Sequence, residues 1–171
     1  DILRHGDFAV YPVEPIIRHG AAVRVEKQPD ATALLEETVH TIRKWQQDGY
    51  ETIAVICREE KEAAELAEQL KSYMEIVDCN PGTTEFGDGV MVLSVAYTKG
   101  LEFDAVLLYD PTQKKYPADN GHVKLLYVAA TRALHELVVL YHGNLSRILT
   151  DPVSKEKKQK VFAAETLTKA K

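Results

Sequence analysis

Three basic residues lie beside or within apolar segments, where a cation is uncommon. Arg58 directly follows the run TIAVIC, Lys99 lies shortly after the run VMVLSVA, and Arg132 lies within YVAATRAL. A guanidinium group is permanently charged and donates hydrogen bonds to phosphate oxygens in a planar fork. A converging pair of arginines would therefore suit a polyphosphate. The alternative is that each arginine pairs with a local carboxylate.

The apolar pattern predicts alternating strands and helices that carry these residues. Asp30 is a suitable N-cap for a helix that ends at Gly49. The strands are continuously apolar, which is typical of a parallel sheet with helices on both faces. The predicted fold class is therefore α/β with a mainly parallel central sheet. The other predicted elements are strands at 52–57, 75–79, 90–96, 105–110 and 136–142 and helices at 59–73 and 123–134.

The order of these elements also suggests where a ligand would bind. Open α/β sheets bind ligands beyond the carboxyl ends of their strands. Arg58 follows the strand at 52–57, and the segment TKGLEF at 98–103 follows the strand at 90–96. We therefore expect both to lie near one site.

The chain length of 171 residues predicts one globular domain. Residues 1–29 hold three prolines and read as a lead-in from a preceding domain, with a short strand near 22–26. Residues 30–150 form the predicted domain. Residues 151–171 form a basic tail, which we expect to be a solvated or frayed helix.

Composition excludes several classes of protein. The whole chain carries a net charge of −5, and residues 151–171 carry +3, so residues 1–150 carry −8. This balance argues against a surface covered with basic residues that bind nucleic acid. No apolar run is long enough for a bilayer and no secretory signal begins the sequence, so we expect a cytoplasmic protein without membrane contact. The two cysteines, Cys57 and Cys79, are expected to be buried free thiols.

Known catalytic motifs are also missing. The six histidines have no zinc-ligand spacing, and no G-x-S-x-G turn is present. The dipeptide Gly-Lys does not occur, which excludes a Walker A phosphate loop. The chain is therefore not a self-contained P-loop NTPase.

Three segments resemble motifs of superfamily 1 helicases of the UvrD/Rep/PcrA group. AVICR is similar to motif IV, LSVAYTKGLEFDAVLL to motif V, and KLLYVAATRALHELVVLY to motif VI, together spanning residues 54–141. The lead-in IIRHG, the short spacing between motifs IV and V, and the ending TRALHELVVLY resemble the HelD-like branch. The resemblance implies the second RecA-like domain of such a motor, a fold without its own phosphate loop.

The resemblance further implies how ATP and Mg²⁺ would be shared between two domains. The N-terminal RecA-like domain would supply the phosphate loop and the metal ligands, so we expect this chain to be inactive as an ATPase by itself. On this side, Arg58 and Arg132 would contact the γ-phosphate, with Arg132 as the arginine finger. Gly100 would let the backbone approach the phosphates, Glu102 would accept a hydrogen bond from the ribose, and Lys99 would face the interdomain cleft or the nucleic acid.

Some positions depart from the family pattern. Only forty residues separate Arg58 from Lys99, so the large accessory insertion of UvrD and Rep is missing. Ser94 and Ala96 replace the Thr and His of motif V, and the His of that motif helps to hold single-stranded DNA. The residues His122, Val123 and Lys124 replace the charged pair that usually precedes motif VI. Candidate nucleic-acid contacts are Ser94, Tyr97 and Thr98.

Two functions fit these observations. The first is the C-terminal half of an ATP-dependent DNA helicase or translocase, whose partners would be its N-terminal domain, single-stranded DNA and, as in HelD-like proteins, RNA polymerase. The second is an inert RecA-like module that serves as a protein-binding platform, which the altered motif V favours. A Walker A motif and an acidic Mg²⁺-binding motif upstream of Asp1 would distinguish the first from the second.

Overall fold

The computed structural model describes residues 22–78 and 87–150. The strands and helices of these residues alternate along the chain, as the sequence pattern predicted. They are β1 (Ala22–Lys27), α1 (Ala31–Gln47), β2 (Thr52–Cys57), α2 (Glu60–Leu70), β3 (Gly89–Ser94), a 3-10 turn (Val95–Tyr97), β4 (Phe103–Tyr109), α3 (Asn120–Ala130) and β5 (Ala133–Tyr141).

The five strands form one sheet in the order β1-β5-β4-β2-β3, and every neighbouring pair is parallel. The prediction of an α/β fold with a mainly parallel sheet is thus confirmed. All strands begin at one edge of the sheet and end at the other. We call the first the amino edge, formed by Ala22, Thr52, Gly89, Phe103 and Ala133, and the second the carboxyl edge, formed by Lys27, Cys57, Ser94, Tyr109 and Tyr141.

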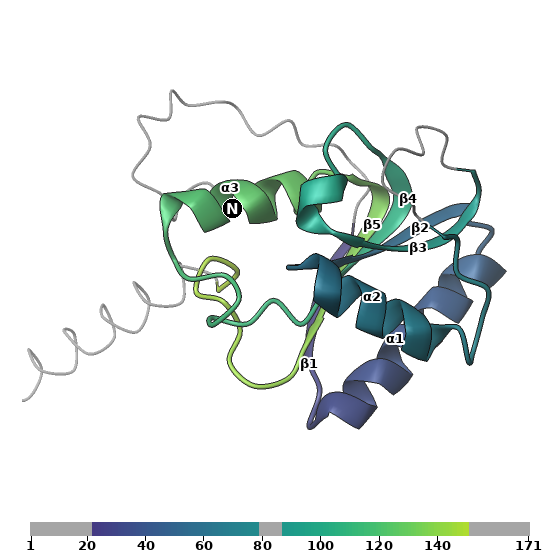
Figure 1. The fold of residues 1–171 in the computed structure, drawn as a ribbon, viewed down its shortest axis with the longest axis horizontal. Helices are drawn as coiled ribbons and strands as arrows, with labels where there is room; N and C mark the ends of the chain where they lie inside the picture. Colours follow the sequence, from purple (N-terminus) through teal and green to yellow (C-terminus); the bar gives the residue numbers. More distant parts are fainter. Residues whose placement is uncertain (1–21, 79–86, 151–171) are drawn as a thin grey trace, which may run out of the picture.

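Helices cover both faces of the sheet (Figure 1), which explains why the strands are continuously apolar. On one face, α1 and α2 bury residues such as Ile42, Trp45 and Leu66 against alternate residues of β2, β3, β4 and β5. On the other, α3 buries Val123 and Leu126. The fold is therefore a three-layer sandwich with one core on each side of the sheet.

Local signals set the helix boundaries. The Asp30 carboxylate accepts a hydrogen bond from Ala33 N at 2.8 Å, which confirms the predicted N-cap of α1. Beyond its end, Gly49 adopts φ +88°, a conformation that favours glycine. Asp119 caps α3 in the same way, accepting from His122 N at 2.9 Å.

Several predicted elements differ from the structure; for example, the helix predicted at 59–73 spans 60–70, and the strand predicted at 136–142 begins at Ala133. Residues 75–78 are not a strand, because the backbone hydrogen bond from Val77 N to Val90 O (2.8 Å) does not extend into a ladder among the described residues. The strand predicted at 90–96 ends at Ser94, since the chain turns back over the sheet at Val95–Tyr97. The helix predicted at 123–134 spans 120–130, so Arg132 lies in the turn before β5 and not in the helix.

Other predictions from the sequence have mixed outcomes. The short strand near 22–26 is confirmed as β1, but the lead-in before it, Cys79 and the tail at 151–171 lie outside the described residues. Cys57 is a buried free thiol, and burial raises its pKa well above the usual value. No helix in the described part of the chain is both long and apolar enough to cross a membrane.

Candidate nucleotide-facing site

Arg132 is held at the amino edge by three oxygen atoms that carry no full charge. Its Nε donates to Val128 O at 3.0 Å, Nη1 to Leu101 O at 3.2 Å, and Nη2 to the Thr131 hydroxyl at 3.2 Å. No carboxylate within the described ranges forms an ion pair with it. The alternative that Arg132 pairs with a local carboxylate is therefore not what the structure shows.

The end of α3 explains this position. A helix leaves its last carbonyl groups without intrahelical partners and carries partial negative charge at its C-terminus. Val128 O is one of these carbonyls, and it accepts from the Arg132 side chain. The positive charge of Arg132 is thus favoured by the helix end, and no full negative charge among residues 22–78 and 87–150 pairs with it. A guanidinium has five N–H donors, so two stay available for a ligand.

The loop between β3 and β4 is the second part of this site. Thr98 begins it with two hydrogen bonds to Val95 O, from its amide at 3.2 Å and its hydroxyl at 2.8 Å. Gly100 adopts φ +80°, and a Cβ built there would meet no atom within 4 Å. The glycine is therefore required by backbone conformation, and the space beside it is open.

Arg132 and this loop are joined directly. Besides the bond from Arg132 Nη1 to Leu101 O, the amide of Phe103 donates to Arg132 O at 2.9 Å. Residues 100–102 and Arg132, which are about thirty positions apart in the sequence, are thus fixed relative to each other. Glu102 is exposed beside them.

A hollow of about 220 Å³ lies against the same loop. Its walls come from the amino ends of β2, β3 and β4 and from the loop itself. It is lined by Thr52, Gly87, Met91, Gly100, Leu101, Glu102 and Phe103. The amino edge therefore combines a cation without an ionic partner, open backbone at a glycine, an exposed carboxylate and a concave surface.

A carboxylate that the sequence analysis did not single out holds the loop in place. Asp104 accepts from the amides of Glu51 (2.9 Å) and Thr52 (3.0 Å), and its own amide donates to the Thr52 hydroxyl (2.9 Å). The backbone hydrogen bond from Thr52 is the largest cause of the lowered pKa of Asp104. The signal that could have revealed it is the aspartate at the first residues of an otherwise apolar strand. Its effect is to tie the start of β4 to the start of β2.

Arg58 lies at the opposite edge of the sheet. It directly follows Cys57, the last residue of β2, and its guanidinium lies 5.8 Å from the centre of the Tyr116 ring. The strand register places Arg58 and Arg132 roughly 20 Å or more apart along the strands. The structure therefore does not bring the two arginines together, because a shared phosphate would need both guanidinium groups at hydrogen-bonding distance.

The remaining predicted site residues differ in their exposure to solvent. Lys99 is exposed on the loop, and Tyr97 is 45% exposed at its start. Ser94 is only 3% exposed and Thr98 is fully buried. Of the three candidate nucleic-acid contacts, only Tyr97 is therefore accessible in this domain. A hydrogen bond to Glu60 raises the pKa of Tyr97.

Lys115 and two carboxylates form a cluster of paired charges at the carboxyl edge. Lys115 donates to Glu62 of α2 and to Asp110, which directly follows β4, the latter at 2.9 Å. Asp110 also accepts from His142 N at 3.1 Å and has φ +50°. Although burial acts to lower it, the hydrogen bonds to Glu62 and Asp110 raise the pKa of Lys115. The sequence analysis missed this cluster because its members come from four separate segments.

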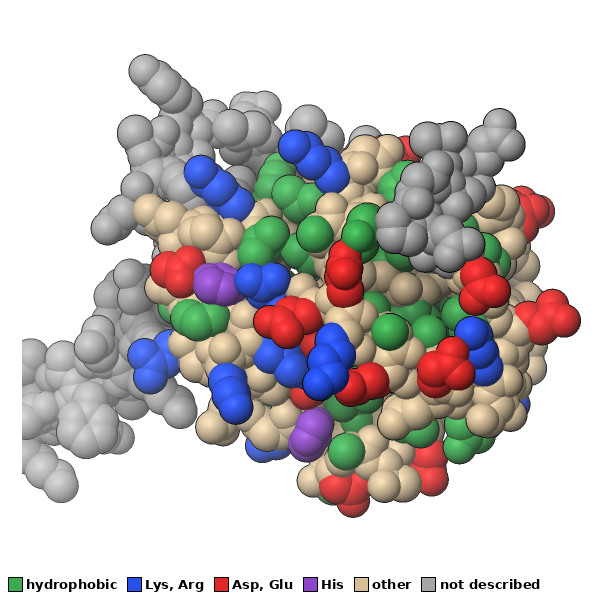
Figure 2. Space-filling model, viewed as in Figure 1, with side chains coloured by type: hydrophobic (Ala, Val, Ile, Leu, Met, Phe, Trp, Pro, Cys, Tyr) green, Lys and Arg blue, Asp and Glu red, His purple; other side chains and the backbone are tan. Residues whose placement is uncertain are grey.

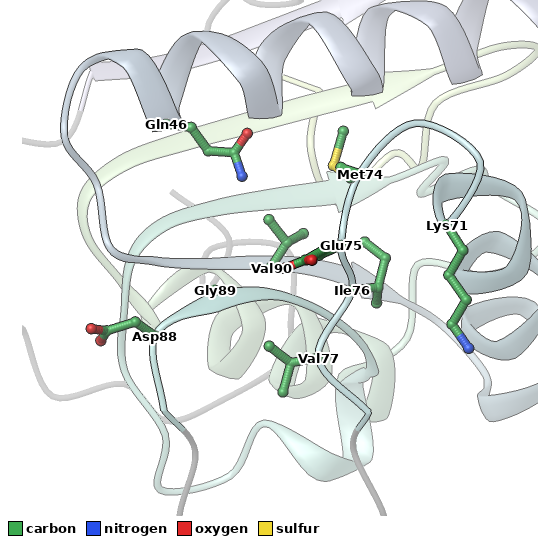
Figure 3. A pocket seen from close by; sticks show the side chains of 9 residues that line it. All are labelled: Gln46, Lys71, Met74, Glu75, Ile76, Val77, Asp88, Gly89 and Val90. Carbon is green, nitrogen blue, oxygen red and sulfur yellow. The ribbon is translucent and has the colours of Figure 1, made fainter.

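Figure 3 shows a larger hollow, of about 770 Å³, on the α1 and α2 side of the same amino edge. Met74, Ile76, Val77 and Val90 make much of its lining, with Lys71 and Asp88 at opposite ends. The ammonium group of Lys71 is engaged by Glu68 at 2.9 Å and Asp78 at 3.5 Å. This hollow therefore offers no cation to a phosphate and is not the candidate site.

Acidic and basic side chains are interspersed on the face seen in Figure 2. They do not gather by sign into a single basic patch there. This agrees with the net charge of −8 for residues 1–150 and does not favour strong binding of nucleic acid by that face.

Comparisons with known proteins agree with this fold, and the family match covers the loop between β3 and β4 and Arg132. Residues 89–140, which include the loop and Arg132, match the family model of the UvrD-like helicase C-terminal domain. The structure is similar to the crystal structure of the C-terminal domain of a possible DNA helicase from Lactobacillus plantarum WCFS1. That match has 27% sequence identity and a TM-score of 0.68, and covers 79% of this chain and 83% of that one. Comparison with curated proteins gave no match.

These matches identify the fold as that of a RecA-like helicase C-terminal domain. Neither match distinguishes the HelD-like branch from other members of the group.

Proposed function

We propose that this chain is the C-terminal RecA-like domain of an ATP-dependent, superfamily 1 DNA helicase or translocase, and that its amino edge closes over ATP held by the N-terminal RecA-like domain. The observation that carries the proposal is the direct hydrogen bond from Arg132 to Leu101 O. It joins an arginine without a carboxylate partner to the loop with Gly100, inside the region that matches the UvrD-like family model.

Arg132, Gly100 and Glu102, which lie beside the amino edge, each have a role that their position supports. The two remaining donors of Arg132 are available to the γ-phosphate, where they would stabilise the charge that develops as the phosphoryl group is transferred. Gly100 leaves room for phosphate oxygens at the backbone, and the exposed carboxylate of Glu102 is available to a ribose hydroxyl. Bound Mg²⁺ would neutralise phosphate charge, and its ligands are expected on the N-terminal domain.

Movement on nucleic acid is the second half of this proposal. The carboxyl edge, where Arg58 and Tyr97 lie, is at the other end of the strands from the ATP-facing residues. We assign single-stranded DNA to that edge in the full-length motor, together with exposed Lys99 of the connecting loop. The HelD-like features of the sequence add RNA polymerase as a partner in the cytoplasm.

The test is Arg132→Ala in the full-length protein. Its kcat for ATP hydrolysis should fall by on the order of 10³-fold, while the affinity for ATP changes much less, because the contact strengthens mainly in the transition state. Arg132→Lys should recover little, since lysine keeps the charge but loses the planar fork.

Arg147→Ala is the matched control, because Arg147 is an exposed arginine after β5 and far along the chain from the loop. It should leave kcat and the melting temperature unchanged. An Arg132→Ala protein that hydrolyses ATP at the normal rate would refute the proposal. A variant that is inactive only because it melts at a much lower temperature would show a structural role instead.

One observation favours a second candidate, an inert RecA-like module that binds another protein. Ser94, which replaces the threonine of motif V, and Thr98, a candidate nucleic-acid contact, are buried and cannot reach a strand in this domain. A titration of the full-length protein with single-stranded DNA at about 150 mM salt separates the two candidates. Binding together with DNA-stimulated ATP hydrolysis favours the motor, and the lack of both favours the platform.

A further inference from the structure

Thr131, the C-cap residue of α3, lies between the helix end and Arg132. Its hydroxyl donates to Val128 O at 2.9 Å and accepts from Arg132 Nη2 at 3.2 Å. Both roles of the hydroxyl are therefore used at once. Donation to a carbonyl polarises the oxygen, which makes it a better acceptor for the guanidinium.

The three contacts of Arg132 define the plane of its guanidinium group. Val128 O takes the Nε donor, Leu101 O takes one Nη1 donor, and the Thr131 hydroxyl takes one Nη2 donor. With one acceptor on each nitrogen, rotation about the last side-chain bonds is restricted. Removing the Thr131 acceptor would free the Nη2 end while the other two contacts remain.

We propose, on the basis of the function proposed above, that Thr131 is a positioning residue for Arg132 that presets the guanidinium for the transferring phosphoryl group. The side chain needs no nucleotide contact of its own. It acts by holding an arginine whose partners in this domain are all uncharged. Preset donors are effective in catalysis because they cost little reorganisation when charge develops.

Three variants of the full-length protein test this role. Thr131→Val keeps the β-branched shape and removes the hydroxyl, Thr131→Ser keeps the hydroxyl, and Thr150→Val is the matched control. Thr150 donates its hydroxyl to Arg147 O at 2.8 Å, the same bond to the carbonyl three residues earlier, but no arginine in the described part of the chain donates to it. The control thus removes the same helix-end or turn contact without touching Arg132.

We expect Thr131→Val to lower kcat by roughly tenfold, the lower end of what one hydrogen bond with a charged partner contributes. KM for ATP and the affinity for ADP should stay within about twofold, while binding of ADP with aluminium fluoride weakens as much as kcat falls, because only the transition state needs the preset plane. Thr131→Ser should behave like the wild type, and the melting temperature of Thr131→Val should match that of Thr150→Val.

Two results would overturn the proposal, and they are distinguishable from failure of the proposed function. If Arg132→Ala loses activity but Thr131→Val keeps the kcat of Thr150→Val, Arg132 acts without Thr131 and only the positioning role fails. A loss in Thr131→Val that affects ADP and ADP with aluminium fluoride equally would show a general structural effect. If Arg132→Ala is fully active, the proposed function itself fails.

Discussion

Lys115 at the carboxyl edge and Arg132 at the amino edge of this sheet are bound in opposite ways. At the carboxyl edge, Lys115 is bound between the carboxylates of Asp110 and Glu62, so its positive charge is neutralised within the domain. At the amino edge, Arg132 binds only uncharged oxygens and Asp104 accepts mainly from backbone amides. A cation held by neutral groups still attracts an outside anion strongly, whereas the paired anion of an ion pair largely neutralises its cation and weakens that attraction. Arg58 at the carboxyl edge likewise has no carboxylate partner within the described residues, so the contrast concerns Lys115 and Arg132, and it makes Arg132 and not Lys115 the candidate for an outside phosphate.

The largest effect on stability is expected at the carboxyl edge, from Lys115→Met. Removing one partner of a fully buried ion pair costs roughly 3–5 kcal/mol. Here the side chains of Lys115, Glu62 and Asp110 are 29%, 21% and 9% exposed, so we expect about 2–3 kcal/mol. Urea unfolding at pH 7 measures this, and ATP hydrolysis by the folded full-length variant should be unchanged.

The pH dependence follows from the raised pKa of Lys115. A raised lysine pKa stabilises the fold below the unfolded value of about 10.4, and this contribution is lost as the pH rises through the higher folded value. The difference between wild type and Lys115→Met should hold from pH 7 to 10 and shrink above it. A variant as stable as the wild type at pH 7 would mean that the ion pairs do not stabilise this edge.

A smaller effect is expected at the amino edge, from Asp104→Asn. The amide can still accept from Glu51 N and Thr52 N, but hydrogen bonds to a charged acceptor are stronger by about 1 kcal/mol. Because the pKa of Asp104 is lowered, this stability is present above the unfolded value of about 3.9 and is lost as the pH falls through the folded value.

Denaturation of Asp104→Asn at pH 7 and near pH 3 checks this sign. The difference in the free energy of unfolding between the wild type and Asp104→Asn should be smaller at the lower pH. Asp88→Asn, a change of an exposed aspartate at the same edge, is the control and should have no measurable effect. An equal gap at both pH values would contradict the charge-dependent role of Asp104.

The smallest effect is expected from Arg58→Ala, and it tests the comparison most directly. Loss of the contact with the Tyr116 ring should cost about 0.5–1 kcal/mol of stability. Because Arg58 lies at the other edge from Arg132, kcat for ATP hydrolysis without DNA should stay within about threefold of the wild type. A loss as large as that of Arg132→Ala would show that both arginines reach the nucleotide when the two domains close.

The elements themselves were largely predictable from the sequence. β2 begins and ends as predicted, at Thr52 and Cys57, and the predicted N-cap Asp30 is confirmed. These features depend on short-range signals, namely apolar periodicity and capping side chains. The prediction of a strand that includes residues 75–78 was wrong, because a short apolar run does not show whether a neighbouring strand will pair with it.

The candidate site was predictable only in part. The residues Gly100, Glu102 and Arg132 were named from motif resemblance, and the structure brings the loop and Arg132 together through Leu101 O. Thr131 and Asp104 were not named, since their value lies in hydrogen bonds to residues that are adjacent only in the folded domain or that look ordinary in the sequence. The burial of Ser94 and Thr98 was likewise invisible before packing.

The sequence by itself determined the α/β alternation, the parallel character of the sheet and the match of residues 89–140 to the helicase family model. Only the tertiary structure decided which edge of the sheet each charged residue occupies. For the loop beside Arg132, the physical reason is the short connection between β3 and β4. Its eight residues, 95–102, are too few for a crossover helix. They cross the sheet directly, so a loop that follows one strand in the sequence ends at the amino edge of the next, beside Arg132.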